Sequence, residues 1–247
     1  MTKPPTGRGP AKPVPGRQAP GRPDQSDRAL STRLRTAKKR TIGSQRWLER
    51  QLNDPYVRAA RAQGWRSRAA FKLIELDERF HLLRPNLRVV DLGAAPGGWT
   101  QVAARRVGDG GRVVALDLLP VEPVPGAILL EGDFQQEATE RAVLDALNGQ
   151  ADLVLSDLAP NTTGHNATDH LRIMGLVELA ADFARKVLAP GGGFVAKVFQ
   201  GGAERELLAA LKRDFVTVRH AKPPASRKDS AEAYLVAQGF RGAPGGT

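Results

Sequence analysis

From Trp47 onward the chain alternates between short apolar runs and longer helix-like stretches, with turn-forming residues between them. This alternation is typical of βαβ units, in which each helix returns the chain so that the next strand runs parallel to the last. The last two apolar runs, which Lys222-Pro223-Pro224 separates, indicate an antiparallel addition. The sequence therefore predicts an α/β domain with a mostly parallel seven-stranded sheet, an antiparallel edge strand and helices on both faces. The expected strands are 88–91, 112–117, 127–131, 153–156, 194–199, 216–220 and 233–238.

The first 46 residues differ from the rest in composition. They contain seven prolines, five glycines and no aromatic residue, and they carry 12 Lys or Arg against two Asp. Such a segment buries too little apolar surface to offset the entropy of ordering, so 1–46 is predicted to be a disordered basic tail. The tail either grips phosphates without sequence preference or only keeps the protein soluble, and its Pro and Gly content disfavours a transit peptide. The folded domain is expected at 47–240, followed by a flexible C-terminus at 241–247.

Composition disfavours several classes of protein. No apolar run reaches the roughly 18 to 20 residues that span a bilayer, and residues 1–25 contain no stretch typical of a signal peptide. The chain has no cysteine, and its four histidines show no metal-ligand spacing. We therefore expect a cytoplasmic protein with no membrane association and no metal site. The net charge of +11 indicates a polyanionic partner, although most of this charge lies in the N-terminal part.

A strand, a turn of small residues and a helix start follow one another at 89–100, which reads Val-Val-Asp-Leu-Gly-Ala-Ala-Pro-Gly-Gly-Trp-Thr. Small side chains let the backbone approach a ligand closely, and ligands of open α/β sheets lie beyond the carboxyl ends of the strands. The turn that begins at Gly93 is therefore a candidate cofactor cradle, although a tight packing turn uses the same residue types. The G-x-G-x-x-G spacing is missing and Pro96 lacks an N–H, which disfavours a nicotinamide oxidoreductase.

Two acidic residues follow later strands at the same edge of the expected sheet. Asp117 ends the second strand, where its carboxylate can accept both hydroxyls of a ribose. Asp133 follows the third strand, where it can accept the amino hydrogens of adenine, and Phe134 offers the ring an apolar face. Either acid can instead cap a helix. Together with the turn, these residues favour an adenosine-bearing cofactor.

Lys197 interrupts the run Phe-Val-Ala-Lys-Val-Phe at 194–199, which is otherwise typical of a buried central strand. A buried lysine is costly unless it is paired. Asp157 closes the preceding strand at the same edge of the sheet and is the expected partner.

These segments resemble the FtsJ-like, RlmE-type family of ribosomal RNA ribose 2′-O-methyltransferases. The resemblance extends from residue 64 to residue 238. The collinear segments that carry it are Ser-Arg-Ala-x-Phe-Lys-Leu at 67–73, Asp-Leu-Gly-Ala-Ala-Pro-Gly-Gly-Trp at 91–99, Asp-Leu-Leu-Pro at 117–120, Gly-Asp-Phe at 132–134, Ser-Asp-x-Ala-Pro-Asn at 156–161, Ala-Pro-Gly-Gly at 189–192, Lys-Val-Phe-Gln at 197–200 and Ser-Arg-x-x-Ser-x-Glu-x-Tyr at 226–234. The long basic tail is the one clear departure from the compact bacterial members of the family.

The resemblance implies a Rossmann-like fold of the kind that uses S-adenosylmethionine. It implies a Lys-Asp-Lys-Glu catalytic tetrad at Lys72, Asp157, Lys197 and Glu232. The cofactor contacts that it implies are Gly97, Trp99, Asp117, Asp133 and Asp157, beside the Gly93 turn and Phe134.

Each member of the tetrad has an expected role in removing a proton from a ribose hydroxyl while that hydroxyl attacks a methyl group. Lys197 is the base or steers the 2′-oxygen, and Lys72 stabilises the negative charge that develops. Asp157 orients Lys197 and the methyl donor, and Glu232 positions Lys72 or the ribose. Ordinary ion pairs are the alternative for any one of these residues, but a weak one for all four.

RNA contacts are expected in the segment that precedes Lys72. Arginine guanidinium groups suit phosphates, and exposed aromatic rings stack on bases. The candidates are Arg58, Arg61, Arg66 and Arg68, with Tyr56 and Trp65 nearby. A solvated helix face for the arginines, and a core position for Trp65, are equally compatible with the sequence.

The expected function is S-adenosylmethionine-dependent 2′-O-methylation of a ribose, of a uridine, in large-subunit ribosomal RNA. The expected partner is ribosomal RNA within the large subunit, and the expected state is a monomer. The same chemistry on transfer RNA or on a messenger RNA cap is the main alternative within enzymes. A catalytically silent RNA-binding factor of ribosome assembly is the alternative outside them, but such a factor would have no need of the tetrad.

Overall fold

The computed structural model describes residues 52–160, 166–199 and 205–242. The expected basic tail, loop residues 161–165 and the chain from 243 onward lie outside the described residues. In chain order the elements are α2 (Pro55–Ala62), α3 (Ala69–Phe80), β1 (Arg88–Leu92), α4 (Gly98–Val107), β2 (Arg112–Asp117), β3 (Ala127–Glu131), α5 (Glu137–Leu147), β4 (Ala151–Ser156), α6 (Asn166–Val187), β5 (Leu188–Phe199), α7 (Arg205–Asp214), β6 (Phe215–Ala221) and β7 (Glu232–Phe240).

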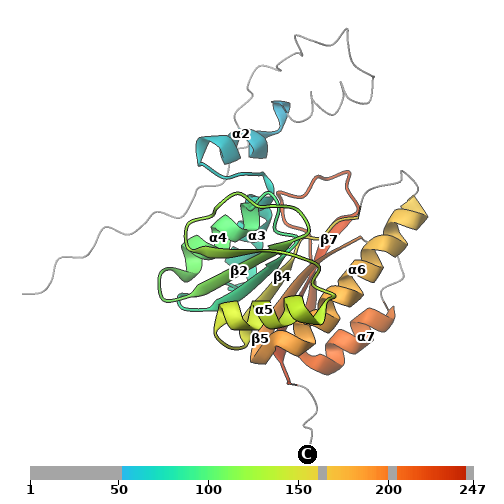
Figure 1. The fold of residues 1–247 in the computed structure, drawn as a ribbon. Helices are drawn as coiled ribbons and strands as arrows, with labels where there is room; N and C mark the ends of the chain where they lie inside the picture. Colours follow the sequence, from blue (N-terminus) through green and yellow to red (C-terminus); the bar gives the residue numbers. More distant parts are fainter. Residues whose placement is uncertain (1–51, 161–165, 200–204, 243–247) are drawn as a thin grey trace, which may run out of the picture.

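The strands form one seven-stranded sheet in the order β3-β2-β1-β4-β5-β7-β6 (Figure 1). Strands β1 to β5 pair in parallel, and β7 runs antiparallel to both of its neighbours, β5 and β6. The expected mostly parallel sheet with an antiparallel contribution at one edge is confirmed. The chain moves outward from β1 to β3 and then returns to β4 on the other side of β1, so the strand order reverses between β1 and β4. Ligands of doubly wound sheets bind at such a reversal.

Helices cover both faces of the sheet, as expected. On one face α2, α3 and α4 bury apolar residues that include Phe71, Leu73 and Val102. On the other face α5, α6 and α7 bury a second cluster that includes Leu147 and Phe183. Figure 1 shows α3 and α4 on one side of the strands and α5, α6 and α7 on the other, with α2 above them at the top of the view. Both faces of β1, β4 and β5 are therefore covered, which explains why these strands are almost continuously apolar.

The start of β5 differs from the expectation. Helix α6 is observed at Asn166–Val187, and β5 begins directly after it at Leu188, whereas the sequence predicts a strand that starts at residue 194. Leu188 pairs with Ala151 before the register of the two strands shifts. The Pro-Gly-Gly-Gly segment therefore forms an irregular part of the strand, where Gly191 has a φ of +84° that favours glycine. Backbone pairing of this kind leaves no periodic pattern of side chains in the sequence.

The antiparallel direction of β7 decides which residues meet at the carboxyl edge of the sheet. Because β7 runs opposite to β5, its first residues lie beside the last residues of β5. Glu232 pairs with Phe199, and Tyr234 pairs with Lys197. Side chains directly opposite each other in an antiparallel pair project from the same face, so Tyr234 and Lys197 are neighbours.

Two absences hold for the described part of the chain. None of its helices combines the length and the apolar character that crossing a membrane requires. No cluster of three or more His, Asp or Glu side chains within it is arranged to hold a metal ion.

Candidate active site

Four polar side chains of the expected tetrad meet at the carboxyl edge of the sheet. Lys72 lies in the first turn of α3, Asp157 directly follows β4, Lys197 lies near the end of β5, and Glu232 begins β7. Each side chain is less than one-fifth exposed. The structure thus brings together residues that are up to 160 positions apart in the sequence.

The four side chains form two ion pairs. Lys72 Nζ lies 2.7 Å from Glu232 Oε1. Lys197 Nζ lies 3.1 Å from Asp157 Oδ1 and donates a hydrogen bond of 2.7 Å to the backbone oxygen of the same residue. The pairing of Lys197 with Asp157 is the one expected from the sequence. Two acceptors on one aspartate fix the direction of the Lys197 ammonium more firmly than a single ion pair would.

Tyr234 joins the two ion pairs, a role that was not predicted from the sequence. Its hydroxyl donates a hydrogen bond of 2.8 Å to Asp157 Oδ1 and lies 3.3 Å from Glu232 Oε1. A signal for this residue was present, because residues two apart in a strand face the same side and Tyr234 is two residues from Glu232. Its ring is fully buried and lies 5.6 Å from the Trp99 ring, centroid to centroid.

The charges of the site set the protonation states of Asp157 and Tyr234. Burial raises the pKa of Asp157, but the positive charges of Lys197 and Lys72 and the hydrogen bond from Tyr234 outweigh it and hold the pKa below its usual value. Burial, together with the negative charges of Asp157 and Glu232, raises the pKa of Tyr234 well above 10. At neutral pH Asp157 is therefore a carboxylate, and Tyr234 keeps the proton that it donates.

Asp91 lies beneath the site at the end of β1 and is completely buried. Thr100 Oγ1 donates a hydrogen bond of 2.7 Å to Asp91 Oδ2, whereas Oδ1 has no hydrogen-bond partner among the described residues. Burial raises the pKa of Asp91 to about 7; the hydrogen bond from Thr100 opposes this rise, and the charges of Asp157 and Asp117 add to it. The sequence predicted Asp91 only as a residue of the first strand, because its neighbours in the sequence do not reveal that both faces of this strand are covered.

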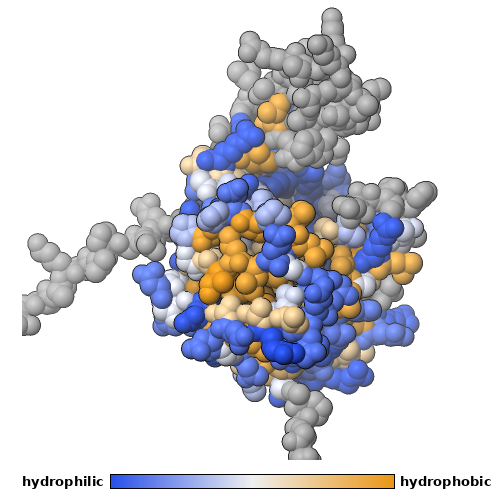
Figure 2. Space-filling model, in the orientation of Figure 1, coloured by the Kyte–Doolittle hydropathy of each residue, from blue (hydrophilic) through white to orange (hydrophobic). Residues whose placement is uncertain are grey.

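A cavity of about 790 Å³ opens beside Asp157 at the point where the strand order reverses, and its size is within the usual range for ligand sites. Figure 2 shows that hydrophobic side chains gather on the face of the molecule between α4 and α5. Leu118 and Leu119, which follow β2, are exposed and also line the cavity. The lining residues are Gly93, Ala95, Leu116, Asp117, Leu118, Leu119, Gly132, Asp133, Phe134, Gln135, Asp157, Leu158, Ala159, Pro160, Arg172, Gly175, Leu176 and Leu179.

Five of the expected cofactor residues line this cavity, namely Gly93, Asp117, Asp133, Phe134 and Asp157. Gly93 has a φ of +73°, and a Cβ atom there would lie 2.7 Å from the Leu158 side chain. Asp117 accepts hydrogen bonds from the backbone N–H groups of Ala95 and Leu119 at 2.8 and 2.9 Å. These bonds orient the Asp117 carboxylate, and each of its oxygens retains a lone pair for a ligand hydroxyl.

Gly97 and Trp99 are not among the described residues that line the cavity. Gly97 lies in the turn before α4 with a φ of +103°, against the guanidinium of Arg66. The Trp99 side chain is buried and donates a hydrogen bond of 2.8 Å to the backbone oxygen of Ala69. These two residues therefore shape the loop that borders the cavity, and the Trp99 ring packs within the core.

A second cavity, of about 420 Å³, adjoins the Lys72–Glu232 pair. Its lining is strongly polar and comes from the start of α3 and from the loop between β6 and β7, with Arg68, Ala69, Lys72, Arg227, Asp229, Ser230 and Glu232. The tetrad thus stands between an apolar cavity that Asp157 lines and a polar cavity that Lys72 and Glu232 line. Such an arrangement suits a reaction between two substrates, one in each cavity.

The four candidate RNA-binding arginines fall into two groups. Arg58 and Arg61 lie on α2, and both are exposed. Arg66 instead donates to the backbone oxygens of Pro96, Glu122 and Pro123. Arg68 binds Asp54 and the backbone oxygen of Ala225, and its side chain is 16% exposed.

The aromatic residues of this segment also point inward. Trp65 is a core residue at 5% exposure, with the Arg105 guanidinium 4.0 Å above its ring centroid. Tyr56 is partly buried, and its ring lies 5.4 Å from the Phe71 ring, centroid to centroid. Of the two interpretations that the sequence left open, the core position is the one observed for Trp65.

Comparison with known proteins agrees with this geometry. The model of the family described as FtsJ-like methyltransferase matches residues 65–240. A ribosomal RNA large subunit methyltransferase E from Paramagnetospirillum magneticum is 60% identical over 232 residues, which cover 92% of this chain and 95% of that protein. The protein of the same name from Acidiphilium cryptum is 64% identical over 216 residues, with 87% and 95% covered.

A solved structure shows the same fold. The crystal structure of a ribosomal RNA methyltransferase from Plasmodium falciparum superimposes with a TM-score of 0.65 at 29% identity, over 72% of this chain and 100% of that chain. The family match spans the tetrad and all the cavity residues, and the relatives align over most of their length. The chain therefore belongs to the FtsJ-like methyltransferase family.

Proposed function

We propose that this protein transfers a methyl group from S-adenosylmethionine to the 2′-hydroxyl of a uridine ribose in large-subunit ribosomal RNA, in the cytoplasm. The observation that carries the proposal is the double ion pair of Lys72–Glu232 and Lys197–Asp157 between the two cavities. The names of the relatives, which are large-subunit ribosomal RNA methyltransferases, support the choice of RNA.

The larger cavity suits S-adenosylmethionine. Asp117 offers carboxylate oxygens for the two ribose hydroxyls, and Asp133 offers them for the adenine amino group. Phe134, with exposed Leu118 and Leu119, supplies an apolar surface for a flat ring. The Gly93 turn leaves space that a Cβ atom would fill. When bound here, S-adenosylmethionine supplies an electrophilic methyl group on a sulfonium centre.

Lys197 is placed to handle the proton of the acceptor hydroxyl. In the neutral form that acts as the base, the Lys197 amine has two N–H groups and one lone pair, and Asp157 accepts both N–H groups through its backbone and side-chain oxygens. These two bonds direct the lone pair toward an incoming 2′-hydroxyl, whose proton it can take. Asp157 binds Lys197 and also lines the larger cavity. It therefore sets the position of the acceptor oxygen, which Lys197 contacts, relative to the cofactor in that cavity.

Lys72 supplies positive charge from the other side of the acceptor. It lines the polar cavity, where negative charge that develops on the 2′-oxygen would be stabilised by a nearby ammonium group. Glu232 holds the Lys72 ammonium at 2.7 Å, and Ser226 Oγ donates a hydrogen bond of 2.9 Å to the same Glu232 oxygen. Glu232 therefore acts as a support for Lys72 with its own position fixed.

The proposal is tested by methyl transfer from labelled S-adenosylmethionine to three acceptors: large subunits, naked large-subunit RNA and transfer RNA, each from cells that lack the gene. We expect label in the large-subunit material, and nucleoside mass spectrometry should find it as 2′-O-methyluridine. Label on a base, or label only in transfer RNA, would overturn the proposal.

A variant of Lys197 tests the mechanism separately from binding. Lys197→Ala should abolish methyl transfer while S-adenosylmethionine binds with nearly unchanged affinity in calorimetry. Lys186→Ala is a matched control, because Lys186 on α6 is also paired with a carboxylate, Glu140 Oε2 on α5 at 3.0 Å. These two helices belong to the layer opposite α3 and contribute no residue to the tetrad. A Lys197→Ala protein with full activity would remove the role assigned to this residue.

A further inference from the structure

A buried carboxylate on α3 takes no part in the mechanism described above. Glu75 is 4% exposed and lies three residues after Lys72, one turn further along the same helix. It is not among the residues that line the polar cavity beside the tetrad, so it is not placed to touch an acceptor there. A buried carboxylate is costly unless its oxygens are hydrogen-bonded, so its partners indicate what it holds in place.

The partners of Glu75 lie on two other segments. Glu75 Oε2 accepts a hydrogen bond of 2.6 Å from the backbone N–H of Ala225, in the loop between β6 and β7. Glu75 Oε1 accepts a hydrogen bond of 3.0 Å from the Tyr56 hydroxyl on α2. One side chain thus connects α2, α3 and the loop that leads into Glu232.

Ala225 is held from its other side as well. Its backbone oxygen accepts a hydrogen bond from Arg68, whose guanidinium also binds Asp54 and lies 5.6 Å from the Tyr56 ring centroid. Asp54 in turn caps α2 by accepting a hydrogen bond from the Tyr56 N–H. Both polar groups of Ala225 are therefore bound to side chains of the α2–α3 layer.

The residue after Ala225 reaches the tetrad. Ser226 is 4% exposed, and its N–H closes a turn onto the Pro223 oxygen at 2.8 Å. Its hydroxyl donates to Glu232 Oε1, the oxygen that pairs with Lys72. The contacts run from Glu75 through Ala225, Ser226 and Glu232 to Lys72. Because Glu75 and Lys72 both belong to α3, these contacts fix the position of the β6–β7 loop relative to that helix.

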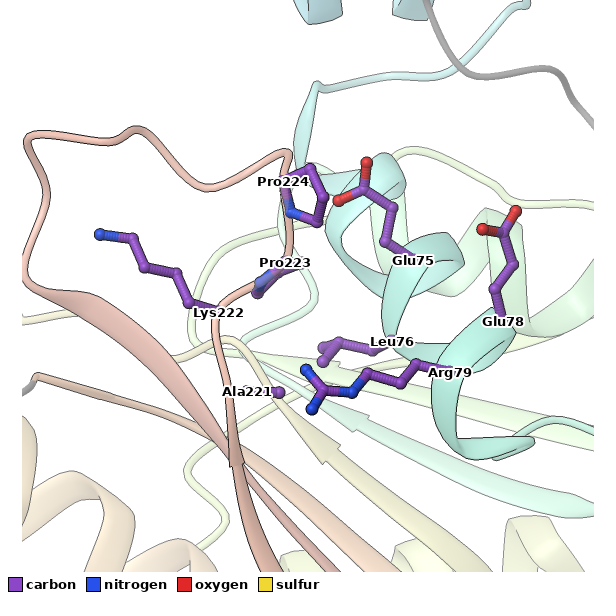
Figure 3. Close-up of a pocket in the computed structure, with 8 residues that line it drawn as sticks. All are labelled: Glu75, Leu76, Glu78, Arg79, Ala221, Lys222, Pro223 and Pro224. Carbon is purple, nitrogen blue, oxygen red and sulfur yellow. The ribbon is translucent and has the colours of Figure 1, made fainter.

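The segment before Ala225 borders a third cavity, which no member of the tetrad lines. This cavity, of about 490 Å³, lies between Glu75, Leu76, Glu78 and Arg79 of α3 and the segment Ala221–Pro224. Figure 3 shows Glu75 and Pro224 beside each other at one end of it, with Lys222 pointing away from α3. Because the cavity interrupts side-chain packing between α3 and this segment, the hydrogen bonds at Ala225 attach the loop to the α2–α3 layer where that packing is absent.

We propose that Glu75 and Arg68 are positioning residues for the acceptor side of the active site, which act by holding Ala225 so that Ser226 fixes Glu232 against Lys72. This inference rests on the proposed function. Arg68, which the sequence made a candidate RNA contact, is instead assigned to contacts within the protein. The cofactor cavity is built by other loops, so a defect in this chain of contacts acts on RNA and on turnover but not on cofactor affinity.

The test compares Glu75→Ala, Glu75→Gln and Ser226→Ala in the full chain, with steady-state methyl transfer to large-subunit RNA and calorimetry of S-adenosylmethionine binding. Glu75→Ala and Ser226→Ala should each lower kcat/KM for RNA by about tenfold, a decrease appropriate to one positioning hydrogen bond, with unchanged cofactor affinity. Glu75→Gln should restore most of the activity, because its amide oxygen can accept from Ala225 and its NH₂ can donate to the Tyr56 hydroxyl.

Two controls separate positioning from stability. Asp77→Ala removes another buried acid of α3, whose hydrogen bond of 2.7 Å comes from the Leu83 N–H in the segment that follows the helix. It should lower the melting temperature and leave the kinetics of the folded enzyme unchanged. In the double variant, Glu75→Ala with Ser226→Ala, the decrease in kcat/KM should be no greater than in the worse single variant, because both break the same chain of contacts.

The outcomes distinguish this inference from the proposed function. If the wild-type protein methylates no RNA, the proposed function fails. If the wild type is active and a folded Glu75→Ala protein has wild-type kcat/KM, or its effect adds to that of Ser226→Ala, the positioning role is wrong. If Glu75→Ala does not fold, Ser226→Ala alone decides, since it removes a hydroxyl without leaving a buried charge, and wild-type kinetics in it would overturn the inference.

Discussion

The Tyr234 hydroxyl donates a hydrogen bond of 2.8 Å to Asp157 Oδ1, and the same carboxylate oxygen lies 3.1 Å from Lys197 Nζ. One oxygen thus receives two donors, one neutral and one charged. Because the raised pKa of Tyr234 keeps its proton in place far above neutral pH, Tyr234 supports the ionised form of Asp157 without competing for a proton.

Replacing Tyr234 with Phe should slow the chemical step. The ring and its packing against Trp99 remain, but Asp157 loses one of the donors that orient it. We expect a fall of roughly five- to tenfold in the single-turnover rate, the usual effect of removing one hydrogen bond. Cofactor affinity should not change, and an unaltered single-turnover rate would show that the hydroxyl has no part in orienting Asp157.

Replacing Gly93 with Ala should weaken cofactor binding. The new Cβ atom would lie 2.7 Å from Leu158 Cδ2 and 3.2 Å from Leu158 Cα, so the wall of the cavity must shift. Gly108→Ala is the matched control, because Gly108 also has a positive φ, +65°, but among the described residues no atom beyond its two chain neighbours lies within 4 Å of the position of its Cβ. Both variants should melt at a lower temperature, and only Gly93→Ala should raise the Kd for S-adenosylmethionine. Equal cofactor affinities in the two variants would contradict this assignment.

Variants of the arginines that precede Lys72 in the sequence should fall into two classes, one with weaker RNA binding and one with a lower melting temperature. Arg58 and Arg61 lie on the outer helix α2, so the double Ala variant should bind RNA more weakly at unchanged melting temperature. The slope of log affinity against log salt should fall by about one for each phosphate that the variant no longer neutralises. Arg66→Ala should instead lower the melting temperature, because its guanidinium holds three backbone oxygens of two loops. An unchanged salt slope in the Arg58 and Arg61 variant would remove α2 from the RNA interface.

The buried Asp91 should give the protein a distinctive dependence of stability on pH. Its pKa is about 7 in the folded protein against an ordinary value of 3.8, so between these pH values the folded state binds more protons than the unfolded state. Stability then falls as pH rises from about 4 to about 7, by an amount on the order of 4 kcal/mol from this group alone. Asp157, whose pKa is lowered, contributes with the opposite sign.

The variant Asp91→Asn isolates this contribution. Its amide oxygen can still accept the hydrogen bond from Thr100, and it has no charge to bury at high pH. Urea unfolding at pH 5 and pH 8 should show that the variant gains stability relative to the wild type at the higher pH. A difference between the two proteins that is the same at both pH values would show that Asp91 does not titrate in this window.

Much of the fold could be predicted because its determinants are local. Strands β2 and β3 are observed at the residues that their apolar runs predict, and β1 and β4 differ only by one or two residues at an end. Hydrophobic periodicity and turn residues act over a few neighbours, so they can be read directly. The start of β5 at Leu188 could not, since it depends on backbone pairing with β4.

The sequence by itself determined the order of strands and helices along the chain. It also singled out Lys197, because a lysine is costly in an apolar strand and therefore stands out among its own neighbours, whereas Lys72 and Glu232 were expected only from the family resemblance. Only the tertiary structure decided which side chains face the site and which are used inside the protein. Tyr234 joins the two ion pairs, the Trp99 ring packs in the core, and Arg66 and Arg68 hold loops. These outcomes depend on contacts between residues far apart in the chain, such as Arg68 and Ala225 at a separation of 157 positions, whose partners are set by the packing of whole elements and not by their neighbours in the sequence.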